Sequence, residues 1–593
     1  MVFAVSLGVM AVAALMLWGW GSAFQKLFAL ERRTWAATAA VGMAVVVFVG
    51  GILNLARLAY PWALAAVVAA GILLALREGI SFEMPPVPVA LMVAWVTIFT
   101  IATQLPPGMY NGHDDFQKYF AYPVRMLETG TVFGSPLSAM GTQTLGAQAF
   151  LDAFPVALFP IVYINGVDAV FGLFLAMMAA SQFGGRLVTT LLCVASVVMI
   201  DPQYANISTL YCGSALIMAV TAVSAPAALG ILYAALIAMK PAFVVFVAIH
   251  LLASARNVRW AVRAVLATAG FLLPWLLLHA PHYMAGLRAR IPVPAPVPGS
   301  VERDSLNLFS FEPLENGASA ASYTLLIVAM GICGAICFRE RKALTCCAAG
   351  IATFFVLIYA VGPLHAGYVQ SLRYYAPVAI GLTPAIFGWS FRSRWLAPAV
   401  AVVSLAAFSP SLWMRAQSAW KAHSVWPYAW TTADADYMEY MNRVLAGPER
   451  DTVQSLQEKV PSGETVLAWI NAPFYLDYRR NRIIDIDPAG IGNPWAAVPE
   501  AHYLIWDYNG FATRDPDWYL RQAVDVGGSE RRNAKLSLDF LRRIESMVAE
   551  GEVIYDNGEV KVVTFKNDAR RASGNVSGSA STGGDRAPRL SRR

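Results

Sequence analysis

Charged residues are scarce in this chain. Asp, Glu, Lys and Arg together make up 14% of its 593 residues, whereas hydrophobic residue types make up 57%. Soluble globular domains carry about 25% charged residues. The composition therefore excludes an ordinary soluble protein and predicts an α-helical polytopic membrane protein.

Cysteine is also rare, and the familiar sequence signatures of soluble enzymes are missing. The six cysteines all lie in or beside apolar runs, which favours packing roles over a disulfide framework. The sequence has no glycine-rich phosphate loop, zinc-ligand spacing or nucleophile elbow. We therefore predict no cofactor, although a divalent cation bound by an acidic pair stays open. The net charge of +6 comes mainly from short loops and the tail, so we predict no nucleic-acid partner.

About fourteen apolar runs are long enough, or nearly so, to cross a hydrocarbon core about 30 Å thick. They lie near 2–20, 36–56, 60–76, 88–104, 161–181, 187–201, 207–223, 226–239, 241–254, 263–280, 321–338, 343–361, 375–390 and 395–411. Basic residues cluster in alternate loops, as is typical of cytoplasmic loops. We therefore expect a multi-pass protein of the bacterial inner (cytoplasmic) membrane, with the loop 105–160 and everything after about 412 outside the cytoplasm.

The composition changes near residue 413. The stretch 413–568 is richer in charge and alternates helical and strand-like segments, which predicts a small extracytoplasmic α/β domain. The expected elements are a helix near 433–459, strands at 465–470, 482–486, 502–506, 553–555 and 560–565, and a helix near 530–549. Polar residues such as Asp485 follow predicted strands, at the edge where α/β sheets bind ligands. The tail 569–593 is rich in Ser and Gly and is predicted to be disordered.

The most informative motif is the acidic pair Asp114-Asp115, which follows the apolar run 88–104 and opens the first long external loop. Acidic residues favour the first turn of a helix, so a structural role for the pair is as plausible as a catalytic one. A carboxylate there could also remove the proton from a sugar acceptor. Together with His113, the pair could instead bind a divalent cation through oxygen ligands.

The order of these parts resembles the GT-C superfamily of membrane glycosyltransferases. The resemblance covers about 87–412, with additional transmembrane helices in 1–86, and depends on the motif Asp114-Asp115-Phe116-Gln117-Lys118-Tyr119. It implies a GT-C-like fold and inverting transfer of a sugar from a polyprenyl-phosphate donor to an envelope glycan or lipid. It also implies that Asp114 or Asp115 is catalytic.

Cations at the outer membrane face could bind the phosphate of such a donor. We expect this role for Lys240 and Arg373, because each follows or precedes an apolar run at that face. Other candidate substrate contacts are His113, Lys118, Tyr119, His365 and Tyr374.

Two alternative functions stay open, a transporter or flippase of lipid-linked glycans and a glycan polymerase or ligase. A transporter needs ionisable residues inside its spans. His250 is the most isolated polar residue of the predicted spans. The scarcity of such residues disfavours a transporter.

Overall fold

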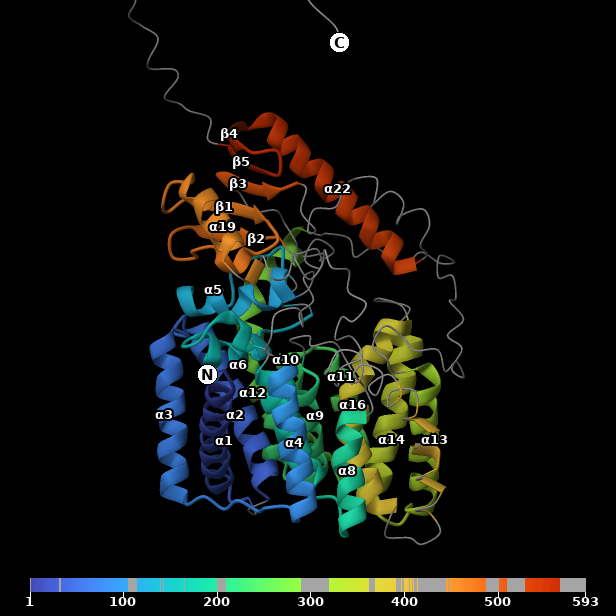
Figure 1. Cartoon of the computed structure of the whole chain (residues 1–593). Coiled ribbons are helices and arrows are strands. Elements are labelled where there is room, and N and C mark those ends of the chain that lie inside the picture. Colours follow the sequence, from blue (N-terminus) through green and yellow to red (C-terminus); the bar gives the residue numbers. More distant parts are fainter. Residues whose placement is uncertain are drawn as a thin grey trace, which may run out of the picture.

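The fold was analysed in a computed structural model of the chain. It describes residues 2–30, 34–104, 115–164 (except 139 and 142), 166–199, 209–289, 319–361, 368–390, scattered positions in 396–413, 444–486 (except 446), 501–508 and 528–565. Most of this chain is helical, and a small sheet lies near its C-terminal end (Figure 1).

Apolar helices form the larger part of the molecule. They are α1 (Val2–Leu27), α2 (Trp35–Leu55), α3 (Pro61–Glu78), α4 (Val87–Gln104), α7 (Leu173–Ala180), α8 (Leu187–Met199), α9 (Tyr211–Ala222), α10 (Pro226–Met239), α11 (Phe243–Ser254), α12 (Val258–Ala289), α13 (Ala320–Ile336), α14 (Arg341–Val356) and α16 (Tyr368–Ser390). Within the described chain, five helices are long and apolar enough to cross a membrane, and seven more are apolar but shorter. The number fourteen stays a prediction.

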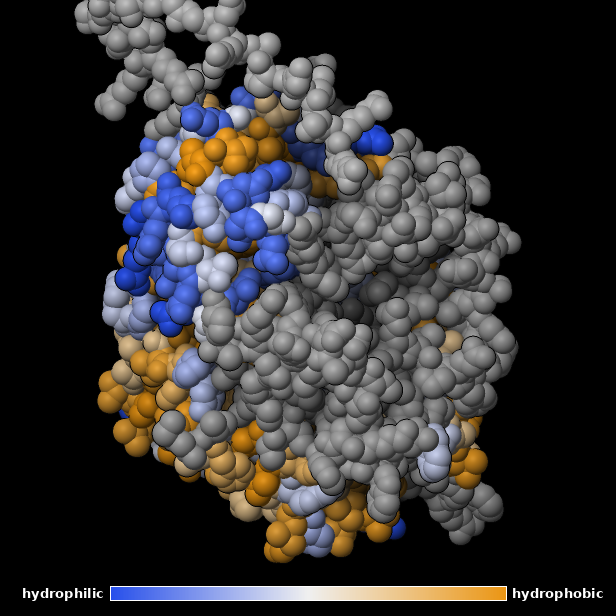
Figure 2. Space-filling view, turned by 45° about the horizontal axis from the view of Figure 1, so that its top comes forward, coloured by the Kyte–Doolittle hydropathy of each residue, from blue (hydrophilic) through white to orange (hydrophobic). Residues whose placement is uncertain are grey.

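The outer surface of these helices is apolar. Large hydrophobic side chains such as Trp62, Leu76, Leu91, Trp95 and Leu266 are exposed. Figure 2 shows hydrophobic surface over the helical part and largely hydrophilic surface over the C-terminal part. Soluble monomers rarely expose such extensive apolar surface. The chain therefore has the surface of a membrane protein.

The predicted basic loops lie at one end of the helical bundle. At this end the ammonium group of Lys26 lies 2.9 Å from Oε1 of Glu78, joining the ends of α1 and α3. The guanidinium of Arg341 donates a hydrogen bond to the carbonyl oxygen of Ala255 (2.6 Å), joining the start of α14 to the end of α11. The C-terminal sheet lies beyond the opposite end of the bundle (Figure 1). This arrangement agrees with the alternation of basic loops in the sequence.

The sheet has five strands in the order β2-β1-β3-β5-β4. The strands are β1 (Thr465–Trp469), β2 (Arg482–Asp485), β3 (Tyr503–Asp507), β4 (Glu552–Asp556) and β5 (Val560–Thr564). Strands β2, β1 and β3 are parallel, whereas β5 is antiparallel to both β3 and β4. All five predicted strands are therefore confirmed.

Two helices complete the α/β part. Alternate residues of the strands form two apolar clusters on the two faces of the sheet. One cluster includes side chains of α22 (Gly528–Glu550), and the other includes side chains of α19 (Pro448–Glu458). Helix α22 confirms the predicted helix near 530–549. Helix α19 confirms the second half of the predicted helix 433–459, and 433–443 lies outside the described residues.

Candidate functional site

Two of the short helices between α4 and α9 have a π-helical hydrogen-bond pattern. They are η1 (Asp115–Tyr119) and η3 (Gly166–Gly172), and each contains a buried acidic residue, Asp115 in η1 and Asp168 in η3. π-Helical turns are rare and often occur at functional sites. Asp115, which the acidic motif singled out, therefore lies in unusual backbone geometry next to the helical bundle.

Asp168 has a clear structural role. Its carboxylate accepts hydrogen bonds from the backbone N–H groups of Leu210 (3.0 Å), Tyr211 (3.1 Å) and Cys212 (2.8 Å). These groups belong to the first turn of α9, where backbone N–H groups have no partner within the helix. Asp168 therefore fixes η3 to the N-terminus of α9.

A further buried acidic residue of this region, Asp152, lies on the short helix α6 (Ala147–Val156). Nε2 of Gln148, one turn earlier, donates a hydrogen bond to Oδ1 of Asp152 (2.9 Å). Burial raises the pKa of the Asp152 carboxyl well above its usual value, and the hydrogen bond from Gln148 partly offsets this effect. The charges of Asp168 and Asp115 raise this pKa further. The three carboxyl groups are thus close enough to influence each other.

Several buried polar atoms around this acidic cluster have no hydrogen-bond partner among the described residues. They are Oδ2 of Asp152, Oε1 of Gln148 and both side-chain amide atoms of Gln117. Buried polar atoms are nearly always hydrogen-bonded in folded proteins, to protein groups or to ordered water. Gln117 lies in η1 with Asp115, and Gln148 lies in α6 with Asp152. These two helices therefore offer spare hydrogen-bonding capacity for a polar ligand.

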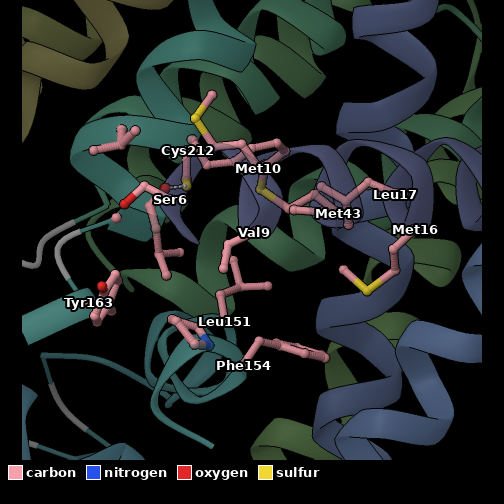
Figure 3. Close-up of a pocket in the computed structure, with 16 residues that line it drawn as sticks. Ser6, Val9, Met10, Met16, Leu17, Met43, Leu151, Phe154, Tyr163 and Cys212 are labelled. Atoms are coloured by element: carbon pink, nitrogen blue, oxygen red, sulfur yellow. Dashed lines mark hydrogen bonds between the residues drawn. The ribbon is translucent and has the colours of Figure 1, made fainter. Parts of the chain in front are cut away.

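An apolar cavity of about 80 Å³ reaches Cys212 (Figure 3), the residue whose backbone N–H donates a hydrogen bond to Asp168. Its walls come from α1, α2, α6 and η3, and include Met10, Leu151 and Phe154. Leu151 and Val167 line the cavity and directly precede Asp152 and Asp168 in the chain. The cavity has room for part of a lipid chain. An apolar compartment and a carboxylate cluster therefore lie side by side.

Some predicted substrate contacts lie at the same end of the bundle. Lys118 is buried in η1, and the neighbouring Tyr119 is partly buried. Lys240 follows the last turn of α10, and its ammonium group lies 5.0 Å from the centre of the Tyr374 ring. The structure thus brings together Lys240 and Tyr374, which are far apart in the sequence.

The segment that precedes α6 is hydrogen-bonded to the C-terminal end of α10. The hydroxyl group of Thr144 donates a hydrogen bond to the carbonyl oxygen of Met239 (3.0 Å), and the N–H of Leu145 donates to that of Ala238 (3.2 Å). Helix α6 begins two residues after Leu145. Lys240 and Asp152 therefore lie at the same end of the bundle.

Other candidates fall outside the description. Asp114, His113 and His365 lie outside the described residues, and so does the predicted tail 569–593. Arg373 belongs to α16, but its side chain is not described. The roles proposed for these residues stay predictions.

The C-terminal sheet is attached to the membrane-proximal helix α5 (Ala121–Thr129) by a buried ion pair. The guanidinium of Arg125 contacts the carboxylate of Asp485 and donates a hydrogen bond to the carbonyl oxygen of Ile483 (3.1 Å). The hydroxyl group of Ser135 donates to the backbone oxygen of Asp485 (2.5 Å). Asp485, expected to face a ligand at the end of a strand, instead binds α5. That expectation was wrong for Asp485, because α5 covers this edge of the sheet.

Aromatic packing joins η1 to the same sheet. The ring of Phe474, which follows β1, lies 5.8 Å from that of Phe116 and 5.2 Å from that of Phe120. Trp469 and Trp506 are buried in the core cluster that includes side chains of α22. Asp115 therefore lies at the junction between the helical bundle and the α/β part.

A second contact of α5 predicts a pH dependence. The N–H of Tyr478 donates a hydrogen bond to Oε2 of Glu128 (2.7 Å). Burial nevertheless raises the pKa of Glu128 from 4.5 to about 6. A raised carboxyl pKa means that the folded state binds the proton more tightly, so the stability that Glu128 contributes is greatest below pH 4.5 and is lost as the pH rises through about 6, when a charge becomes buried. We expect the melting temperature to fall over this range, and Glu128→Gln to reduce the fall because Gln stays neutral and still accepts the bond.

Glu464→Gln provides a matched control, because Glu464 is partly buried and pairs with His502 within the sheet (2.6 Å). This control should not reduce the fall in melting temperature between pH 4.5 and 6. An unchanged pH dependence in Glu128→Gln would contradict the assignment to Glu128.

Asp152 and Asp168 were not among the site residues predicted from the sequence. Their signal was present, because each is a single acidic residue within an otherwise apolar stretch. Acidic residues in such a setting usually have a functional or structural partner. The effect of Asp168 and Asp115 on the pKa of Asp152 depends on how η1, α6 and η3 pack together, which no local pattern reveals.

A cation site formed by Asp114, Asp115 and His113 stays a prediction, because Asp114 and His113 lie outside the described residues. Within the described residues, no three His, Cys, Asp or Glu side chains lie close enough together to bind a metal ion.

A scan against protein-family models found no match to this chain, and a search of curated proteins found no similar sequence.

Proposed function

We propose that the protein is a membrane glycosyltransferase of GT-C type that moves a sugar from a polyprenyl-phosphate donor to an extracytoplasmic glycan or lipid. One observation carries the proposal: Asp115, the acidic residue singled out by its motif, is buried and raises the pKa of the buried Asp152, which directly follows Leu151 in the wall of an apolar cavity. A lipid-linked sugar requires both environments, a carboxylate for the sugar and an apolar surface for the lipid.

The proposed chemistry requires a general base, and one of these carboxylates provides it. The acceptor hydroxyl attacks the anomeric carbon and must lose its proton, and a carboxylate within hydrogen-bond reach accelerates this step about 10²- to 10⁴-fold. Asp115 is the proposed base in the described part of the chain, and Asp114 is the alternative base from the motif. Asp152, whose pKa is raised mainly by burial, holds and orients the acceptor with Gln148. Asp168 is occupied by α9 and supports the site.

The leaving group in this scheme is a lipid phosphate. Lys240 and Arg373 are the proposed phosphate ligands, with Tyr374 beside Lys240. The proposal places this end of the bundle, and the α/β part with it, outside the cytoplasm, because the basic loops lie at the opposite end. The transfer would therefore take place at the outer face of the membrane.

A lipid-linked glycan transporter is the second candidate. One observation that the sequence analysis did not use favours a transporter: Asp168 is buried in an apolar helical segment. Its carboxylate, however, is occupied by three backbone N–H groups of α9. A carboxylate held by a helix N-terminus is poorly suited to bind and release a substrate or an ion during transport. We therefore favour glycosyl transfer.

The role of Lys240 can be tested directly. We expect Lys240→Gln to raise the KM for the donor about tenfold with a smaller change in kcat, because a phosphate contact made in the ground state contributes mainly to binding. Lys459→Gln is the matched control, since the Lys459 ammonium also lies over a tyrosine, 4.2 Å from the Tyr555 ring centre, but in the α/β part. Initial rates at varied donor concentration give both constants. Equal KM changes in the two variants would contradict a phosphate role.

A further inference from the structure

A second cavity, of about 370 Å³, lies at the end of the bundle away from the sheet. Residues of α9, α10, α11, α14 and the start of α12 line it. Its polar lining includes His250, Ser254, Arg256, Trp260, Arg341 and Lys342. This cavity is separate from the acidic cluster, since none of the residues that line it belongs to η1, α6 or η3. Arg341 donates a hydrogen bond to the carbonyl oxygen of Ala255 and so joins α14 to the end of α11.

Positive charge is concentrated around this cavity. Arg256, Arg341 and Lys342 are exposed and line it, and none of them forms an ion pair with a carboxylate in the described part of the chain. Arg341 and Lys342 are also the first two residues of α14. The free N–H groups of a helix N-terminus carry partial positive charge, so cations at this position repel the helix dipole as well as one another. An anion between them would relieve this repulsion.

His250 provides an independent indication of a ligand. It is buried and lines the cavity. Its Nδ1 atom lies 2.6 Å from the hydroxyl oxygen of Tyr233 and 3.2 Å from that of Ser254. No hydrogen bond of Nε2 with any described residue is present. When Nδ1 accepts a hydrogen bond from the Tyr233 hydroxyl, Nε2 carries the ring hydrogen and can donate a hydrogen bond to an anion.

The surroundings of the cavity identify the source of the anion. Large apolar side chains are exposed nearby on the same elements, namely Leu252, Val258 and Leu344. Such side chains suit acyl chains, whereas the cations suit a phosphate, to which Arg can donate two parallel hydrogen bonds. Basic pockets between transmembrane helices bind anionic lipid head groups.

We propose that this cavity binds the phosphate of an anionic phospholipid, with Arg256, Lys342 and His250 as its ligands. Arg341 holds the cavity together through its bond to Ala255. The proposal does not depend on glycosyl transfer, because binding can be measured without a donor or an acceptor.

The test uses the full-length protein purified in a neutral detergent. We expect phosphatidylglycerol, but not phosphatidylcholine, to raise the melting temperature, and the double variant Arg256→Gln/Lys342→Gln to bind phosphatidylglycerol about 30-fold more weakly by native mass spectrometry. The matched control is Arg259→Gln/Arg339→Gln, which removes two exposed cations close to the cavity that do not line it. The control should keep its affinity.

Further variants guard against misfolding. Arg256→Lys/Lys342→Arg keeps both charges and should keep most of the binding. Equal losses in the Gln variant and in the control would show a non-specific effect of surface charge and would overturn the site. Stabilisation by inorganic phosphate equal to that by phosphatidylglycerol would overturn the lipid as the ligand, because a soluble anion would then suffice.

Discussion

Asp115→Asn is expected to lower glycosyl transfer at least about 100-fold while the folded protein persists. Asn keeps the shape and most of the hydrogen bonding of Asp but cannot accept the proton of the acceptor. A purely structural carboxylate makes the opposite prediction, because Asn caps helices as well as Asp does. The rate is measured with purified protein, and equal melting temperatures of variant and wild type would exclude a folding defect.

Two further variants sharpen this test. Asp152→Asn should impair transfer less, because the Asn oxygen still accepts the bond from Gln148. Asp539→Asn is the control, since Asp539 is an exposed carboxylate on α22. Retained transfer in both single variants and in the double variant Asp115→Asn/Asp152→Asn would remove the acid–base role from this cluster.

Loss of Arg125 should have the second large effect. The side chains of Arg125 and Asp485 are only 5% and 2% exposed, so Arg125→Ala leaves a buried carboxylate without its cation. Breaking a buried pair from one side costs about 3–5 kcal/mol. We expect the α/β part to separate from α5, measured as much faster proteolysis within residues 444–565.

Two comparisons make the Arg125 prediction specific. The matched control Asp539→Ala breaks the pair with Arg542, in which the side chains are 56% and 62% exposed, and should change stability by less than about 1 kcal/mol. The double variant Arg125→Met/Asp485→Leu replaces both charges by apolar groups and should recover much of the loss. Wild-type protease resistance in Arg125→Ala would show that this ion pair does not hold the sheet to α5.

Elements with a local pattern could be predicted from the sequence. The predicted strand at 482–486 is a short run rich in isoleucine between polar segments, and β2 (Arg482–Asp485) lies where it was expected. The predicted helix near 530–549 is α22 (Gly528–Glu550). These predictions succeeded because a strand or a helix depends on residues within a few positions of one another.

Partnerships between distant residues could not be predicted in this way. Arg125 and Asp485 are 360 residues apart in the sequence. His250, the most isolated polar residue of the predicted spans, has Tyr233 and Ser254 as hydrogen-bond partners in the structure. The hydroxyl group of Tyr233 comes from a neighbouring helix, and the sequence does not state which helices are neighbours.

Transfer in proteoliposomes tests the central claim most directly. Purified protein is reconstituted with a radiolabelled polyprenyl-phosphate sugar and an envelope extract as acceptor, and Asp115→Asn protein serves as the inactive control. Glycosyl transfer predicts that label moves to the acceptor and that free polyprenyl phosphate is released in equal amount, with neither product formed by the control. Movement of intact labelled donor across the bilayer, without released polyprenyl phosphate, would contradict the account and identify a transporter instead.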